Sequence, residues 1–258
     1  SIYDAGVPVP PVGTRVYVED LSISVPPADP TALDLALDDV KAYILGQADP
    51  NSYLVKFKVL TDSDNSRSYA SHRGFHTFNY NMELYGDSQT ASRVDISLKA
   101  DKFLYIHDIR GGTGPNFGFF VQYNFGSSGG MTDSYVERTI NFDQSSNLTI
   151  ENNTISNFDS DATVIIRGPA SKALVGNMAT FRYNTVSGTI GFQLERNAVL
   201  DLGTTGNDGN NLLSFSDTAI LGISTFNGTV IADKDAWIGD VVIAKSGKES
   251  TNNSGLEK

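Results

Sequence analysis

Glu151 and Asp201 are the two carboxylates whose positions best suit acid–base chemistry on a sugar. Each ends a short strand-like run, Leu148–Glu151 and Ala198–Asp201. Hydrolysis of a glycosidic bond needs two carboxyl groups across that bond, about 5 Å apart for retention and about 6.5–9.5 Å apart for inversion. If the two runs lie two strands apart in one sheet, at about 4.8 Å per strand, the carboxylates are about 10 Å apart. The spacing roughly fits an inverting pair, so Glu151 and Asp201 are the candidate catalytic residues.

Arg182 ends a third run of the same kind, and the alignment of the three runs places it between the two carboxylates in one outward column. A guanidinium at this position would suit an acidic sugar, which makes Arg182 a candidate carbohydrate-binding residue. A second interpretation needs no ligand, because opposite charges stacked on neighbouring strands stabilise a sheet modestly. The sequence leaves both interpretations open. Whether the protein is an enzyme, a polysaccharide hydrolase or lyase, is therefore undecided at this point.

Three tyrosines are further candidates for carbohydrate binding: Tyr123, Tyr135 and Tyr183. A tyrosine ring presents an apolar face that can stack on a sugar, and its phenol gives the exposed edge a polar tip. Phenylalanine lacks that tip, so the many phenylalanines near Tyr123 are expected mainly in the core. We therefore predict that these three tyrosine rings are exposed.

The composition argues against several other classes of function. The chain has no cysteine, which excludes disulfides, thiolate zinc sites and cysteine nucleophiles. A net charge of −11 argues against a nucleic-acid partner, since phosphate contacts need a basic surface. No run of about 18 apolar residues is present, so membrane insertion is not expected. The histidines His72, His76 and His107 form no recognised metal motif, and Asp62–Asn65 lacks the distal Glu of an EF-hand, so we expect neither a metal nor a cofactor.

An internal repeat indicates which elements carry these residues. Asn153, Asn184 and Asn211 each stand between two strand-like runs and recur at intervals of about 30 residues. A third apolar run completes each unit, at 163–166, 190–194 and 219–223. Three short strands per unit, with an Asn at the first bend, are typical of a right-handed parallel β-helix. The Asn side chains of successive coils would then stack as a hydrogen-bonded ladder.

Alternation along the first unit predicts which side chains face the core of such a coil. Leu148, Ile150 and Ile155 should point inward, because successive side chains of a strand point to opposite faces. Their neighbours should point outward: Thr149, Glu151, Thr154 and Ser156. The alternative fold is an antiparallel β-sandwich in which the recurring Asn–Thr pairs are coincidental.

One convincing helix precedes these strands. Its apolar residues recur at helical spacing and make one stripe: Leu33, Leu37, Val40 and Ile44. Asp29 or Thr31 suits its N-cap, and Gly46 follows its end. Three acidic residues lie off the stripe and are expected to face water: Asp34, Asp38 and Asp39. We therefore expect an all-β protein with a short N-terminal capping helix. Its segments would be an N-terminal part with the helix and first coil (1–90), the β-helix (91–245) and a flexible tail (246–258).

The residues around this helix resemble a known family. Asp29–Leu33 followed by 36–38 resembles the capping-helix motif of pectate-lyase-like right-handed parallel β-helix proteins. The stretch from Thr31 to Gly86, a helix, then a strand, then a Gly–Asp turn, is most similar to bacteriophage tailspike and tail-fibre proteins. This resemblance implies glycan recognition, an elongated homotrimer and a place on a virion tail or extracellular surface. It does not imply a particular enzyme.

Three hypotheses follow for the function. The first is a phage tail receptor-binding protein that recognises bacterial surface polysaccharide. The second is a polysaccharide depolymerase that acts through Glu151 and Asp201. The third is a structural or adhesin β-helix fragment whose binding site lies elsewhere.

Overall fold

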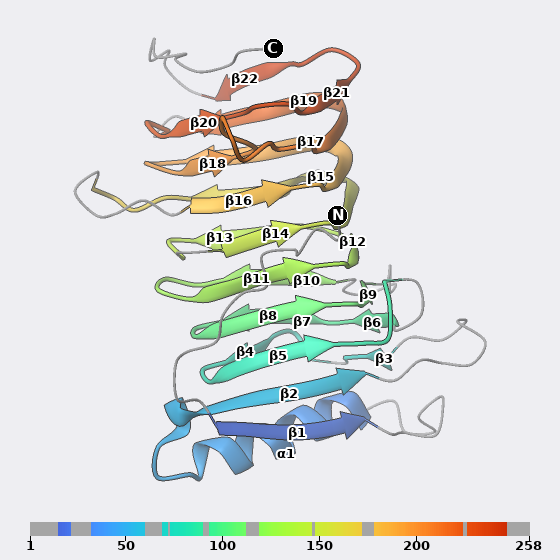
Figure 1. The fold of residues 1–258 in the computed structure, drawn as a ribbon, viewed down its shortest axis with the longest axis vertical. Coiled ribbons are helices and arrows are strands. Elements are labelled where there is room, and N and C mark those ends of the chain that lie inside the picture. Colours follow the sequence, from blue (N-terminus) through green and yellow to red (C-terminus); the bar gives the residue numbers. More distant parts are fainter. Residues whose placement is uncertain are drawn as a thin grey trace.

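The computed structural model is an all-β parallel β-helix whose described residues include one α-helix near the N-terminal end, followed by a short 3-10 helix, η1 (Pro50–Ser52) (Figure 1). It describes residues 15–21, 32–59, 69–71, 73–89, 93–111, 119–145, 148–171, 178–223 and 226–246. The strands stack along the long axis of the molecule. Helix α1 (Ala32–Leu45) lies beside β1, at the end of the stack that the first strands form (Figure 1). Neighbouring strands within both sheets pair in parallel, for example β1 with β2 and β14 with β16. The predicted fold class is therefore confirmed, and an antiparallel sandwich is excluded.

Each coil contributes strands to two sheets, and the second sheet folds into two faces. The first sheet contains β1 (Arg15–Leu21), β2 (Tyr53–Val59), β5 (Asn81–Tyr85), β8 (Phe103–His107), β11 (Ser128–Thr132), β14 (Leu148–Glu151), β16 (Met178–Arg182), β18 (Val199–Asp201) and β20 (Thr229–Ile231). The second sheet begins with β3 (Tyr69–Ala70), β6 (Arg93–Asp95), β9 (Arg110–Gly111) and β12 (Tyr135–Glu137) on one face. Its other face contains β4 (His76–Phe78), β7 (Ser97–Ala100), β10 (Phe120–Tyr123) and β13 (Ile140–Asp143).

Three long strands join the two faces of the second sheet. They are β15 (Thr154–Arg167), β17 (Thr185–Glu195) and β19 (Leu212–Ile223), and β21 (Ala236–Ile238) and β22 (Ile243–Ser246) pair with the two ends of β19. The predicted second and third runs of each repeat are thus halves of one bent strand. The pairing register shifts between Asn157 and Ala162 and again between Gly188 and Ile190, which is where these strands turn the corner.

The interior is a continuous apolar core that alternation along the strands creates. Leu148, Ile150 and Ile155 are buried, as predicted. A column of aromatic rings runs along the same interior, with ring centroids 5.6–6.1 Å apart: Tyr123, Phe142, Phe181, Phe192 and Phe215. Such close edge-to-face and offset contacts add to the burial of the rings. Stacked coils therefore bury one shared core that no single coil could form.

The predicted asparagine ladder is present. The backbone N–H and Nδ2 of Asn153 both donate to Oδ1 of Asn184, at 3.0 and 3.1 Å. Asn184 donates in the same way to Asn211, at 2.9 and 3.1 Å. Asn211 in turn donates to Oδ1 of Asp235, at 3.0 and 2.8 Å. The three asparagines are equivalent corners of successive coils, and Asp235 is the next rung.

The residue before each corner adopts a left-handed backbone conformation. These residues have φ between 50° and 57°: Asp108, Asp133, Asn152, Tyr183, Asn210 and Lys234. Non-glycine residues rarely adopt this conformation, which costs free energy for a residue with a Cβ atom. Its recurrence in six coils shows that it makes the sharp bend from the first sheet to the second. The side chains of these six residues form a column along one edge of the solenoid, here called the corner column.

Helix α1 packs on the first coil as predicted, with one correction. Its stripe is buried: Leu33, Leu37, Val40 and Ile44. Asp34, however, does not face water but is 1% exposed. Its Oδ1 accepts a hydrogen bond from Ser71 Oγ at 2.6 Å and lies 2.6 Å from His76 Nε2. Asp38 does reach the surface, where it pairs with Arg73. Asp34 is buried because His76 on β4 points into the interior beneath the start of α1. The buried imidazole needs a polar partner, and the Asp34 carboxylate provides it.

Several other predictions concern residues outside the described part of the chain. These residues are the N-cap candidates Asp29 and Thr31, the loop Asp62–Asn65, His72 and the tail beyond Ser246. The predicted boundary near residue 90 stays a prediction. No helix in the described part of the chain is long and apolar enough to span a membrane.

Candidate functional site

The structure brings Glu151, Arg182 and Asp201 together, but not in one column. Glu151 is in register with Arg182, whereas Asp201 is in register with Thr180. The single outward column expected from the sequence is therefore wrong by two residues at Asp201. A shift of two preserves which side chains face outward, so alternation along β18 could not reveal it.

Arg182 is fully engaged by its neighbours. It forms an ion pair with Asp201 at 2.9 Å, and its Nε donates to Oδ1 of Asn207 at 3.2 Å. Its Nη1 donates to the carbonyl oxygens of Phe181 and Asp201. Glu151, Arg182 and Asp201 are each at most 5% exposed. Their catalytic and sugar-binding roles stay predictions, and a sugar could reach Arg182 and Asp201 only if the segment that both of them bind moved.

That segment is the turn from Gly203 to Gly209, here called the 203–209 loop. Oδ1 of Asp201 accepts a hydrogen bond from the Gly203 N–H, and Arg182 holds Asn207 as described above. The Gly209 N–H donates to the Asp233 carbonyl at 2.9 Å. Gly209 has no room for a side chain, because a Cβ atom there would lie 1.7 Å from the Leu202 carbonyl oxygen. The buried charges thus anchor a tight loop on the first sheet.

Tyr123 is in the core, which corrects the expectation that its ring is exposed. It is 1% exposed, and its hydroxyl donates to the carbonyl oxygens of Leu104 and Gly130 at 3.2 and 2.8 Å. Alternation along β10 points Phe120 outward and Tyr123 inward. Two backbone carbonyls satisfy the phenol, so a tyrosine is accommodated in the interior. Its ring is not available to a glycan outside the solenoid.

The other two candidate tyrosines do reach the surface. Tyr135 is half-buried under the Arg110 guanidinium, which lies 5.2 Å from the ring centroid. Burial and the neighbouring Glu137 raise the pKa of Tyr135. Tyr183 is 40% exposed and belongs to the corner column. The roles of both in carbohydrate binding stay predictions.

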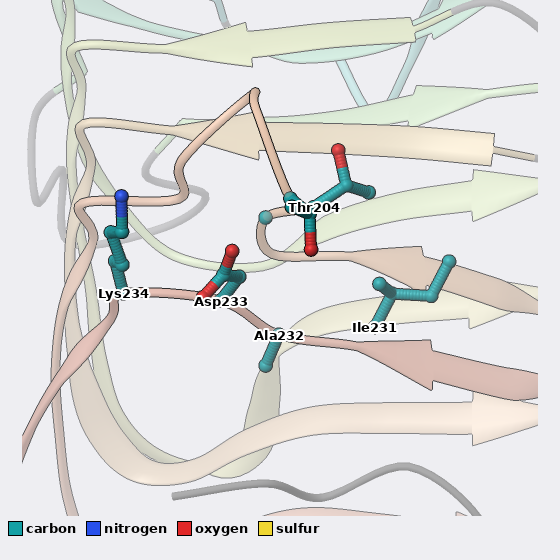
Figure 2. Close-up of a pocket in the computed structure, with 7 residues that line it drawn as sticks. Thr204, Ile231, Ala232, Asp233 and Lys234 are labelled. Atoms are coloured by element: carbon teal, nitrogen blue, oxygen red, sulfur yellow. The ribbon is translucent and has the colours of Figure 1, made fainter.

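A pocket of about 410 Å³ opens beside the 203–209 loop (Figure 2). Its lining comes from that loop and from the segment after β20: Gly203, Thr204, Thr205, Ile231, Ala232, Asp233 and Lys234. Lys234 Nζ forms an ion pair with Asp208 at 2.8 Å, which raises the pKa of Lys234. Figure 2 shows the Asp233 side chain between those of Thr204 and Lys234. Two hydroxyl groups and a carboxylate are suited to hydrogen-bond a polar ligand of one or two rings.

Tyr183 stands close to this pocket along the corner column. Its backbone N–H donates to the carbonyl oxygen of Gly209, the last residue of the 203–209 loop, at 2.9 Å. Tyr183, Asn210 and Lys234 occupy the corner in three successive coils, so Tyr183 and Lys234 are about 10 Å apart along the stack. Sequence reasoning found Tyr183 but missed the pocket. The available signal was the extra-long Gly-rich turn between Asp201 and Asn211.

No protein-family model, curated protein or solved structure matches this chain. Its function must therefore be argued from the chemistry of its own residues.

A second polar cluster lies on the outer surface of the first sheet and surrounds His107. Its Nε2 lies 3.0 Å from Glu83 Oε1, and its Nδ1 lies 2.7 Å from Asp108 Oδ2. The imidazole also stacks on the rings of Tyr85 and Tyr105, with centroids 5.0 and 4.5 Å away. Burial lowers the pKa of His107, but hydrogen bonds to Glu83 and Asp108 outweigh it, and the pKa is raised overall. Both imidazole nitrogens already have carboxylate partners. The cluster therefore joins two neighbouring coils, through β5 and β8, and leaves no imidazole nitrogen for a ligand.

The buried group of Ser71, His76 and Asp34 is not a catalytic triad. In a triad the acid bonds Nδ1 of the histidine while the serine bonds Nε2. Here Nε2 of His76 faces both partners, at 2.6 Å from Asp34 and 3.1 Å from Ser71. All three side chains are buried, Asp34 on α1 itself and the other two on the coil that it contacts. In the described part of the chain, no group of three or more acidic or histidine side chains is arranged to hold a metal ion.

Proposed function

We propose that this protein is a receptor-binding β-helix of the phage tail type, which recognises bacterial surface polysaccharide at the pocket beside the 203–209 loop. The observation that carries this proposal is the pocket itself, with the exposed Tyr183 ring near it. Hydroxyl and carboxylate groups can bond the hydroxyls of a sugar, and an aromatic ring can stack on its C–H face.

The scaffold supports this proposal because it holds the site rigidly. The pocket lining is tied to the ladder, since Asp233 and Lys234 immediately precede its last rung, Asp235. A preorganised site loses less conformational entropy on binding. The resemblance of the helix and first strands to phage tailspike and tail-fibre proteins adds the expectation of a homotrimer on a virion tail or another extracellular surface.

The geometry does not favour the hydrolase alternative through Glu151 and Asp201. Asp201 is committed to Arg182 and to the Gly203 N–H, and both carboxylates are buried. A hydrolytic pair must contact the glycosidic oxygen and a water molecule from opposite sides. Glycan recognition at the adjacent pocket requires no such access.

Binding to a panel of purified capsular and O-antigen polysaccharides, measured by calorimetry, tests this proposal. We expect one or more of them to bind, and a Tyr183→Asn variant to bind about two- to tenfold more weakly, because it loses the stacking ring. Asparagine is chosen since it tolerates the left-handed conformation at this corner. The matched control is Tyr43→Asn, which removes an exposed tyrosine from α1, at the other end of the solenoid.

Equal loss of affinity in both variants, or in neither, would move the site away from this pocket. Absence of binding to every polysaccharide would overturn the proposed function. Release of oligosaccharide from any bound polysaccharide would revive the depolymerase alternative, which a Glu151→Gln, Asp201→Asn double variant would then test.

A further inference from the structure

We propose that the pocket beside the 203–209 loop selects sugars that carry a positive charge, namely amino sugars with a free amine, over uronic acids. This inference rests on the proposed function, because it names the class of sugar that the same pocket would take. It follows from an inventory of the charges in and next to the pocket.

The two cations at this site, Lys234 and Arg182, already form ion pairs with carboxylates of the protein. Lys234 is the one cation among the lining residues, and its ammonium group bonds Asp208 at 2.8 Å. Arg182 lies beneath the 203–209 loop, 2% exposed, with its guanidinium bound to Asp201, Asn207 and two backbone carbonyls. A carboxylate on a sugar would have to compete with these partners. The acidic sugar that the sequence suggested for Arg182 therefore has no cation ready to receive it.

One carboxylate, by contrast, is left for a ligand. Asp233 lines the pocket, and no hydrogen bond or ion pair among the described residues engages its side chain. Its backbone is fixed, since its carbonyl oxygen accepts the Gly209 N–H at 2.9 Å. In Figure 2 its carboxylate lies between the side chains of Thr204 and Lys234. A positioned acceptor of this kind suits a charged donor.

The surroundings strengthen the preference for a cation. Asp208 balances Lys234, so Asp233 leaves the lining with a net negative charge. The whole chain has a net charge of −11, which repels an anionic glycan before it reaches the pocket. A protonated sugar amine would donate a charge-assisted hydrogen bond to Asp233, while Thr204 and Thr205 bond the neighbouring ring hydroxyls. A uronate in the same place would put two carboxylates side by side.

Three tetrasaccharides of similar size test the proposal by calorimetry in slightly acidic buffer: a glucosamine oligomer with free amines, its N-acetylated counterpart and an oligogalacturonate. We expect the free-amine oligomer to bind at least about tenfold more tightly than the oligogalacturonate. Asp233→Asn should weaken binding of the free-amine oligomer about tenfold and leave the N-acetylated oligomer unchanged. The matched control is Asp217→Asn, an equal change of charge at an exposed residue on β19.

The outcomes separate this inference from the proposed function. A preference for free amines that Asp233→Asn abolishes and Asp217→Asn retains would support it, and a switch of preference to the oligogalacturonate in Asp233→Lys would support it further. A preference for the oligogalacturonate, or a free-amine preference that survives Asp233→Asn, would overturn the inference while glycan binding stands. If none of the three oligomers binds while a bacterial polysaccharide does, the amino-sugar inference fails alone. If nothing binds, both fail.

Discussion

Asp235 is a rung of the ladder that carries a carboxyl group in place of an amide. Its Oδ1 accepts two hydrogen bonds from Asn211, as the asparagine Oδ1 atoms do in the coils before it. Its Oδ2 occupies the position of a donating Nδ2 but is buried without a hydrogen-bond partner among the described residues. Burial, which disfavours the ionised form, raises the pKa of Asp235 to about 6. The protonated acid is thus the form that best fits the ladder.

This residue makes the stability of the protein depend on pH. The folded chain binds the Asp235 proton more tightly than the unfolded chain, whose ordinary value is 3.8. The unfolding free energy therefore falls as the pH rises from about 4 to about 6, and the loss is complete above that range. We predict that Asp235→Asn, which restores an Nδ2 donor, raises the melting temperature at neutral pH by about 2–4 °C.

Thermal unfolding monitored by circular dichroism at several pH values checks this prediction. The variant should also show a flatter dependence of melting temperature on pH between about 4 and 6. Asp217→Asn serves as the control, because it removes an exposed carboxylate outside the ladder. A lower melting temperature for Asp235→Asn at neutral pH would contradict the interpretation of Oδ2 as an unmatched acceptor.

His107 gives a second pH dependence, of the same sign as that of Asp235, whereas its partner Glu83 gives one of the opposite sign. Its pKa in the folded protein lies above the ordinary value of 6.5, so the stability it adds is present below that pH and is lost as the pH rises through its folded pKa. Burial raises the pKa of its partner Glu83, but bonds to His107 and Lys56 outweigh it and lower the pKa overall. The contribution of Glu83 is therefore present above its ordinary value of 4.5 and is lost as the pH falls through its folded pKa.

We predict that His107→Phe, which keeps the stacking on Tyr85 and Tyr105, lowers stability by about 1 kcal/mol between about pH 4.5 and 6.5. The difference from the parent protein should shrink as the pH is raised further, because the parent loses its imidazolium. Urea denaturation at several pH values would measure this difference. A deficit of constant size across all pH values would mean that packing, rather than charge, holds the cluster together.

Among the elements of the fold, the ladder fixes the register of successive coils. Each rung links a corner to the next coil and also to a backbone carbonyl of the coil before it, as when Asn184 Nδ2 donates to Ile150. The recurring Asn residues and the apolar alternation predicted this arrangement from sequence. The bounds of the strands were harder to predict from the sequence. Each of β15, β17 and β19 continues through a corner, where the sequence pattern indicates the end of one strand and the start of another.

We predict that Asn184→Ala, in the middle of the ladder, lowers the melting temperature by roughly 5–15 °C. The change removes two bonds donated by Nδ2 and leaves two donors of Asn153 without their acceptor, all in the buried corner. Differential scanning calorimetry would show it. The control is Asn210→Gly, which removes an exposed Asn next to the ladder and tolerates its positive φ. Similar melting temperatures for both variants would refute a structural role for the ladder.

The whole molecule is a solenoid in which each coil contacts chiefly its neighbours. Stability in such folds is close to a sum of coil and interface contributions. Helix α1 covers the core at one end, through its apolar stripe and the buried Asp34–His76 contact. If the proposed phage tail type is correct, three such solenoids should lie side by side.

We predict that the protein is a homotrimer in solution, as the family resemblance implies. Sedimentation equilibrium at several concentrations should give three times the chain mass of 27.8 kDa. A mass that stays at one chain across the concentration range would refute the trimer and weaken the proposal of a phage tail type. It would leave glycan binding at the pocket untouched, because every lining residue belongs to a single chain.

The sequence by itself determined the features that depend on local periodicity. Alternating apolar residues fixed which side chains form the core, and the spacing of Asn153, Asn184 and Asn211 predicted the ladder, because coils that repeat must bring equivalent residues together. Tertiary structure alone decided the pairing of Asp201 with Thr180, the inward position of Tyr123 and the burial of Asp34. A register shift of two residues leaves each side chain on the same face of the sheet, so the alternation of apolar residues does not reveal it. A polar side chain can be buried wherever a carbonyl oxygen or a histidine from a distant part of the sequence forms a hydrogen bond with it. Those partners come from other coils, which no local pattern in the sequence specifies.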